Sequence, residues 1–249
     1  MAFLRSFSVV TVLLFFFEKT QISQANLTTF GIQLKPLFSS GFVGAGSVEA
    51  QSGVLRSVIA PASGLNYGMV IRRGLSKAWS VESGICFVRR NFELMTYNNE
   101  VTGPLSSSFR LICYEVPLQA LVFVKLGEKL YMNGSGGVSF DIYPSDVETF
   151  ASDNIDSVFF DVQHRTIRRK WFQTAMLINY GFEYRTARKG YYYLGVTYHR
   201  SFQDIATSWV RQLRNNDPED LFLPMSGNYL TVDFRYFFNE KPEIKNKRQ

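Results

Sequence analysis

The stretch NYLTVDFRYFF, residues 228–238, alternates between apolar and polar side chains almost without interruption. Five of its large apolar residues share one parity: Leu230, Val232, Phe234, Tyr236 and Phe238. Asp233 and Arg235 share the other parity. Because successive side chains of a β-strand point to opposite faces, this pattern predicts one strand with an apolar face and a charged face. In a soluble protein the apolar face forms the core, whereas in an outer-membrane barrel it faces lipid and the charged face lines the lumen.

The same alternation recurs along the chain. Further strands are predicted at 30–38, 65–73, 79–90, 114–126, 129–143, 172–185 and 191–200. With 228–238 they make eight strands, an even number.

The connections between these segments alternate in length. Short connections lie at 74–78, 127–128 and 186–190, and long ones at 39–64, 91–113, 144–171 and 201–228. This alternation is typical of an all-β, eight-stranded antiparallel up-and-down transmembrane barrel with short periplasmic turns and long extracellular loops. A soluble lipocalin-type barrel is the alternative, but nothing in that fold requires short and long connections to alternate.

The first residues predict export. Arg5 precedes the nine-residue apolar run 9–17, and the small residues of Ser23–Ala25 form a cleavage site. The run is too short for a membrane-spanning helix, which needs about 20 residues. We therefore expect a cleaved signal peptide at 1–25, a barrel at 26–238 and a basic periplasmic tail at 239–249, in the bacterial outer membrane.

The composition agrees with a membrane barrel. Aromatic residues are 16% of the chain, with 23 Phe and 13 Tyr. The net charge of +6 does not indicate nucleic-acid binding, because the bases alternate with aromatic residues instead of forming one patch. The expected partners are outer-membrane lipids and other envelope or secretion proteins.

The parity opposite the apolar one predicts a charged interior. It carries six bases and five acids: Lys35, Arg72, Arg90, Lys125, Arg185, Arg235, Glu82, Glu115, Asp141, Glu183 and Asp233. Side chains just fill the inside of an eight-stranded barrel, so these charges must pair with one another. Such a balanced set favours a salt-bridged plug over a selective pore.

The two cysteines, Cys86 and Cys113, also fall on the interior parity of neighbouring strands. A hairpin symmetric about Asn99 and Glu100 would place them directly opposite each other. A disulfide and a pair of inert interior thiols both remain open, because the predicted compartment permits disulfides.

Few residues suggest chemistry. His164 and His199 have no cysteine or carboxylate at metal-ligand spacing in the sequence, so neither a metal site nor a cofactor is expected. His199 and Ser201 would share a face of a strand, as in a lipid hydrolase with a His-x-Ser pair, but the signal is weak. We expect no catalytic residues. In the long connection 201–228, Ile205, Trp209 and Leu213 are spaced as one face of a short helix and are the candidate contacts for a partner.

The segment YEVPLQALVFVKLGEKLYMNGSGGVSF resembles the central hairpin of the PorT-like outer-membrane β-barrel family of Bacteroidetes. Its acidic-aliphatic-Pro-Leu motif matches 115–118, and its glycine-rich strand matches Tyr131, Gly134, Gly136 and Gly137. The segments 191–205 and 229–238 are similar to its last two strands, although this chain continues beyond the terminal aromatic residue, Phe238. The resemblance implies an outer-membrane location, and some members of the family serve protein secretion.

Taken together, the sequence predicts a non-enzymatic outer-membrane barrel that acts through its extracellular loops or within an envelope or secretion complex. A small-solute or lipid carrier and a lipid hydrolase are the alternatives.

Overall fold

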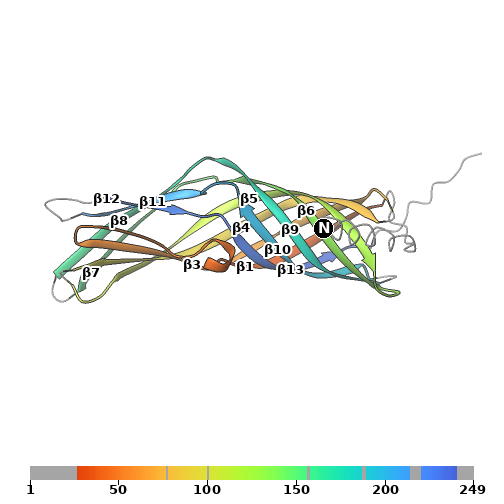
Figure 1. The fold of residues 1–249 in the computed structure, drawn as a ribbon, viewed down its shortest axis with the longest axis horizontal. Coiled ribbons are helices and arrows are strands. Elements are labelled where there is room, and N and C mark those ends of the chain that lie inside the picture. The colour runs from red at the N-terminus through yellow and green to blue at the C-terminus, as the bar shows by residue number, and fades with distance from the viewer. Residues whose placement is uncertain are drawn as a thin grey trace, which may run out of the picture.

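Eight antiparallel strands form a closed barrel. The computed structural model describes residues 27–76, 78–99, 101–155, 158–186, 189–213 and 220–239. Its main sheet runs β1-β13-β10-β9-β6-β5-β4-β3 and closes through the pairing of β1 with β3 (Figure 1). The barrel strands are β1 (Thr28–Phe38), β3 (Leu55–Gly74), β4 (Trp79–Asn98), β5 (Leu105–Lys125), β6 (Leu130–Ile142), β9 (Phe172–Arg185), β10 (Tyr191–Ser201) and β13 (Tyr229–Phe237). The predicted barrel is therefore confirmed. The predicted signal peptide and the tail from 240 onward lie outside the described residues.

The outer surface of the barrel is apolar and its interior is polar. Leu34, Met69, Ile178 and Leu194 are all about half exposed on the outward face. On β13 the outward positions include Phe234, while the alternate positions, such as Asp233, are buried. This arrangement buries polar groups and exposes apolar ones, as a barrel in lipid requires. No helix in the described ranges is long and apolar enough to cross a bilayer.

The predicted short turns lie together at one end of the barrel. Residues 75–78, 126–129 and 186–190 connect β3 to β4, β5 to β6 and β9 to β10. The start of β1 and the end of β13 are at the same end, because Gly31 pairs with Phe237. This is the periplasmic end of an outer-membrane barrel.

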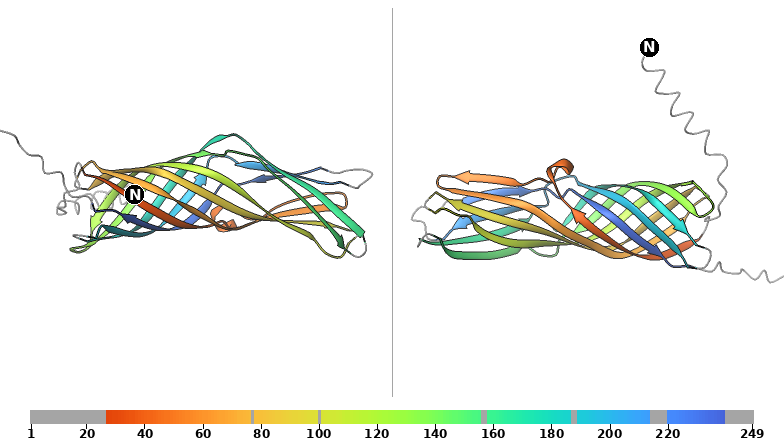
Figure 2. Two further views of the ribbon diagram at one scale, coloured as in Figure 1. Left: turned by 180° about the vertical axis from the view of Figure 1, so that it is seen from behind. Right: turned by 90° about the horizontal axis from the view of Figure 1, so that it is seen from below.

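At the opposite end, the strands continue well beyond the length that a membrane requires. β3, β4 and β5 have 20, 20 and 21 residues, whereas a transmembrane strand needs about 9–11. Their outer halves, joined by β2 (Val48–Ser52), project from the barrel (Figure 2). A second sheet, of order β12-β11-β8-β7, faces them. It consists of β7 (Val147–Ile155), β8 (Val158–Arg168), β11 (Ala206–Gln212) and β12 (Asp220–Met225).

The two sheets form an extracellular sandwich with an apolar core. We use "the sandwich" for β2, the outer halves of β3–β5, and β7, β8, β11 and β12. Its core includes Ile59, Leu94, Phe109, Val162 and Leu223. β12 lies beside β2, and β7 beside β5, without strand pairing at either edge.

The predicted long extracellular connections are present, but they are folded largely as strands of the sandwich instead of as loops. The reason is that the apolar side chains switch from one parity to the other along each of these long strands. In β4, Ile85 and Phe87 point outward to lipid, but Phe92 and Leu94 point inward to the sandwich core. A strand inferred by following one apolar parity ends where that parity changes, although the hydrogen bonding continues. Within the predicted connection 39–64, the 3-10 turn η2 (Gly41–Val43) lies at the rim of the barrel.

The two cysteines lie inside the barrel but not opposite each other. The β4–β5 register pairs Cys86 with Glu115 and Cys113 with Val88. The expected direct pairing is wrong because the hairpin is centred one residue later than a turn about Asn99 and Glu100. Both side chains are buried free thiols.

Candidate functional site

Charged side chains fill the barrel interior in two clusters, one in its periplasmic half and one at its extracellular end. Lys125, at the end of β5, is half-buried. The structure places in the clusters the other ten residues that the interior parity predicted: Lys35, Arg72, Glu82, Arg90, Glu115, Asp141, Glu183, Arg185, Asp233 and Arg235. Apart from Arg185, at the periplasmic mouth, none is more than 4% exposed.

The periplasmic cluster is a chain of alternating charges. Arg72 Nε donates to Glu82 Oε2 at 3.0 Å, and Arg72 Nη1 donates to Glu183. Arg235 donates to the other oxygen of Glu82 and to Asp233 Oδ2 at 2.5 Å. Each carboxylate is therefore shared with a guanidinium, which is the condition for keeping buried charges.

Aromatic rings close the periplasmic mouth below this chain of charges. The Arg72 guanidinium carbon lies 3.9 Å from the centre of the Phe237 ring. The Arg185 guanidinium carbon lies 4.0 Å from the Tyr131 ring and 4.9 Å from the Phe123 ring. These contacts are within the range of cation–π attraction. The rings and the paired charges together fill the lumen of a barrel of this size.

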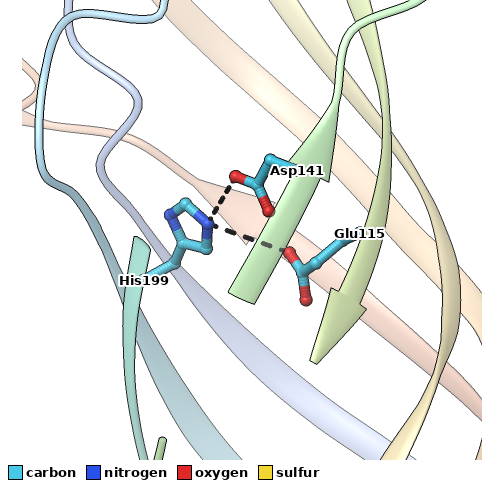
Figure 3. Close-up of side chains that lie close together, drawn as sticks. All are labelled: Glu115, Asp141 and His199. Carbon is cyan, nitrogen blue, oxygen red and sulfur yellow. Dashed lines mark hydrogen bonds and ion pairs between the residues drawn. The ribbon is translucent and has the colours of Figure 1, made fainter. Parts of the chain in front are cut away.

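The extracellular cluster brings together three titratable side chains from three strands (Figure 3). His199 on β10 directs Nε2 toward Asp141 Oδ2 on β6 at 3.0 Å and toward Glu115 Oε2 on β5 at 4.0 Å. All three side chains are almost completely buried. They lie where the polar barrel interior meets the apolar sandwich core.

Both ring nitrogens of His199 face hydrogen-bond acceptors. Its Nδ1 lies 3.2 Å from the carbonyl oxygen of Gly227, and its Nε2 faces the Asp141 carboxylate. Both partners only accept hydrogen bonds, so the ring donates to both when it is doubly protonated. Arg90 supplies a positive charge beside them, with Nη2 at 3.9 Å from Asp141 Oδ2.

Two further side chains orient the carboxylates. The Tyr229 hydroxyl donates to Glu115, and its ring stacks on His199 with 4.3 Å between centroids. The Ser139 hydroxyl donates to Asp141 Oδ1. Every member of the cluster therefore has a fixed orientation.

These residues fit an ion-pair network better than a metal centre. The ligand atoms of Glu115, Asp141 and His199 lie within 4.8 Å of one another, a spacing that a divalent cation can bridge. However, Asp141 already accepts from Ser139 and contacts both Arg90 and His199, and Glu115 accepts from Tyr229. The carboxylates therefore already have partners within the protein, which is the condition for burying them.

The same geometry does not form a hydrolytic triad. A triad needs a nucleophile hydrogen-bonded to its base. Both nitrogens of His199 are taken by Gly227 and Asp141. Among the described residues, Ser201 Oγ has no hydrogen-bond partner.

The second histidine, His164, belongs to the sandwich. Its Nδ1 lies 2.9 Å from Thr149 Oγ1, and its Nε2 lies 2.8 Å from Thr166 Oγ1 and 3.2 Å from Ser208 Oγ. These hydroxyls can satisfy both nitrogens of a neutral imidazole ring, since each hydroxyl can donate or accept a hydrogen bond. Burial lowers the pKa of His164 to about 4.

The predicted helix at Ile205, Trp209 and Leu213 is wrong. Residues 206–212 form β11, which pairs with β8 and β12. Ile205 is completely buried in the core, whereas Trp209 is partly exposed and Leu213 is exposed. The three side chains do not form one contact surface.

Trp209 lies on the outward side of the sheet β12-β11-β8-β7. We call this surface the outer sheet face. Trp209 is paired with Phe222 on one side and Arg165 on the other. Phe222 is 61% exposed, and Phe150 on β7 is 66% exposed. The face therefore presents aromatic rings to the extracellular side.

Sequence reasoning missed the residues that hold the extracellular cluster together. Tyr229 lies on the interior parity of 228–238 and was recognisable there as a buried phenol. Gly227 contributes only its backbone carbonyl, from the link between β12 and β13, and no side-chain pattern could indicate it.

The fold defines an outer-membrane β-barrel protein. No protein family's sequence profile matches the chain, and no curated protein matches it. Among solved structures it is similar to the outer membrane protein OprG from Pseudomonas aeruginosa. The sequences are 14% identical and the TM-score is 0.51, over 88% of this chain and 100% of the OprG chain.

The translocator domain of the autotransporter NalP from Neisseria meningitidis is a more distant match. It is 8% identical over 96% of each chain with a TM-score of 0.22, too low to support an argument. The similarity to OprG supports the barrel fold and the location in the bacterial outer membrane. At 14% identity, this similarity gives no information about activity.

Proposed function

We propose that the protein is a sealed, non-enzymatic barrel that holds an extracellular binding surface rigidly above the outer membrane. The observation that carries this proposal is the continuity of β3, β4 and β5, each of which runs from the barrel into the sandwich as one strand, with one bulge in β3 between Ala62 and Leu65. A continuous strand transmits position and orientation, so the sandwich is a fixed platform on the barrel.

The outer sheet face is the proposed contact surface. Phe150 and Phe222 are exposed and Trp209 is partly exposed on the extracellular side, and aromatic residues are enriched where proteins bind one another. Arg211 and Asp220 pair beside them, with Arg211 Nε 2.5 Å from Asp220 Oδ1. Aromatic residues flanked by charged groups suit another envelope protein as partner. The resemblance to the PorT-like family would make that partner part of a secretion assembly.

The packed interior supports a role in binding and not in conduction. Ion pairs and aromatic rings obstruct the barrel from the periplasmic mouth to the extracellular cluster, and the apolar sandwich core lies beyond. A solute carrier or porin would need a polar path through this core.

In-cell photo-crosslinking tests the contact surface. A photoreactive phenylalanine analogue at position 150 or 222 should give one defined cross-linked product in the native host. The matched control is position 42, whose phenylalanine is 96% exposed on the 3-10 turn at the barrel rim. Equal products from all three positions would contradict a specific surface.

A planar-bilayer recording tests the sealed barrel. The purified protein should show no stable unitary conductance. A reproducible, ion-selective open channel would contradict the proposal of a plugged interior.

A further inference from the structure

The lipid-facing surface carries a groove between two rows of large side chains. The first row crosses five strands in register: Leu130, Tyr184, Tyr192, Tyr236 and Ile32. The second row runs parallel to it: Phe182, Leu194, Phe234 and Leu34. Nearly all of these side chains are about half exposed.

The two rows are separated by open space because the residues between them point into the barrel. Tyr193, Arg235 and Gln33 occupy the intervening positions and turn their side chains into the lumen, where they are buried. Only their backbone faces outward, at the floor of the groove. The groove has a volume of about 540 Å³ and is lined by both rows. This volume falls within the range of about 300–1,000 Å³ that is typical of ligand sites.

The groove has a direction relative to the membrane. Barrel strands are tilted by about 35–45°, so a row that follows the strand pairing rises obliquely around the barrel. At the low end, Leu130 follows the periplasmic turn 126–129. At the high end, Leu34 lies midway along β1. The groove therefore leads from the periplasmic headgroup level into the hydrocarbon core.

Among the described residues that line or border the groove, the outward polar side chains lie at the low end. The two periplasmic turns beside it carry exposed Lys129 and Lys189 against one acid, Glu128. The Tyr236 hydroxyl is fixed there by donating to the Lys189 carbonyl oxygen at 2.7 Å. Ammonium groups at this level attract a phosphate, and tyrosines are common where headgroups meet hydrocarbon.

We propose that this groove binds one glycerophospholipid of the periplasmic leaflet. An acyl chain lies between the two rows, and the headgroup phosphate is held by Lys129 and Lys189. The groove opens to hydrocarbon along its length and has bases only at its lower end, which matches the polarity of a phospholipid. A second copy of the chain would need a complementary ridge with an acidic end, and the described lipid-facing surface presents apolar side chains.

Native mass spectrometry with phosphatidylglycerol as the probe tests this site. The delipidated barrel is mixed with the lipid in detergent, and the number of lipids retained per barrel is measured. Leu194→Trp would fill the groove. Leu118→Trp is the matched control, because Leu118 also faces lipid, on β5, and is 46% exposed against 52% for Leu194. Heat-dependent gel mobility verifies that both variants are folded.

The wild type and Leu118→Trp should retain one phosphatidylglycerol, and Leu194→Trp should retain at least about tenfold less. A double Lys129→Ala/Lys189→Ala variant should lose phosphatidylglycerol but retain diacylglycerol, which lacks the phosphate. Arg73→Ala, an exposed base at the same end on β3, should change neither. The site is refuted if the wild type retains no lipid, if both tryptophan variants lose it equally, if detergent is retained in the same amount, or if a dimer forms in place of the lipid complex.

Discussion

Arg90 and His199 donate to the same atom, the carbonyl oxygen of Gly227, from 2.9 Å and 3.2 Å. Gly227 belongs to the link between β12 in the sandwich and β13 in the barrel. These two side chains therefore fasten the sandwich to the barrel at the link itself. A Cβ at this glycine would lie 2.1 Å from Ser201 Oγ and 2.3 Å from Ile205 Cγ2, so any larger residue would force these side chains to shift.

Removing His199 should destabilise the protein by about 3–5 kcal/mol, because Asp141 then keeps a buried charge with a weaker counterion. His199→Leu is the variant, and Tyr198→Leu, whose side chain points outward next to it, is the control. The urea midpoint of protein folded in vesicles measures the effect. Equal midpoints for the two variants would mean that the His199–Asp141 contact contributes nothing to stability.

The stability of the sandwich should fall as the pH is lowered from about 6.5 to about 4. His164 has its pKa lowered from 6.5 to about 4 by burial. The unfolded state therefore binds the proton more readily than the folded state within this interval. The free energy of unfolding therefore keeps its full value above pH 6.5 and falls by roughly 3 kcal/mol as the pH is lowered toward 4.

Carboxylates titrate in the same interval, so the measurement is a comparison with His164→Gln. Hydrogen exchange of β8 and β11 should become faster in the wild type as the pH falls, after correction for intrinsic exchange rates. In His164→Gln that dependence should be smaller. Identical pH dependence in both proteins would contradict the assignment to His164.

The barrel could be predicted from the sequence because lipid imposes a strict alternation on every strand. In 230–238 each outward position is apolar and most inward positions are polar, so both faces could be assigned. The interior charges followed from the same parity. The way in which they pair could not be predicted, since Glu183 and Arg72 are far apart in the sequence and lie on strands that are not neighbours.

The sandwich could not be predicted because its apolar parity is the inverse of that in the barrel. Its candidate helix shows a second difficulty. Ile205, Trp209 and Leu213 are four residues apart, a spacing that fits one face of a helix and also one parity of a strand. Thr207 and Val210 are β-branched and favour the strand, which is the observed structure.

Both cysteines should react as free thiols. Cys86 lies opposite Glu115, and its sulfur accepts a hydrogen bond from Gln33 Nε2 at 2.9 Å. Because both side chains are buried, a maleimide should label neither in the folded barrel and both after denaturation without reductant. Mass spectrometry counts the labels. Denatured protein that takes up no label would indicate a disulfide instead.

The last prediction concerns the sandwich core as a unit separate from the barrel. Leu94 is buried in that core, on the part of β4 that lies beyond the membrane. Leu94→Ala leaves a cavity and should cost roughly 2–5 kcal/mol. Met95→Ala, at the next and outward-facing position, is the control and should cost little.

The loss should appear locally, because the barrel interior is held by its own ion pairs and does not share the sandwich's apolar core. Hydrogen exchange should therefore become faster in β7, β8, β11 and β12, while β1, β9, β10 and β13 keep their protection. An equal increase in all of these strands would show that the barrel and the sandwich unfold together as one cooperative unit.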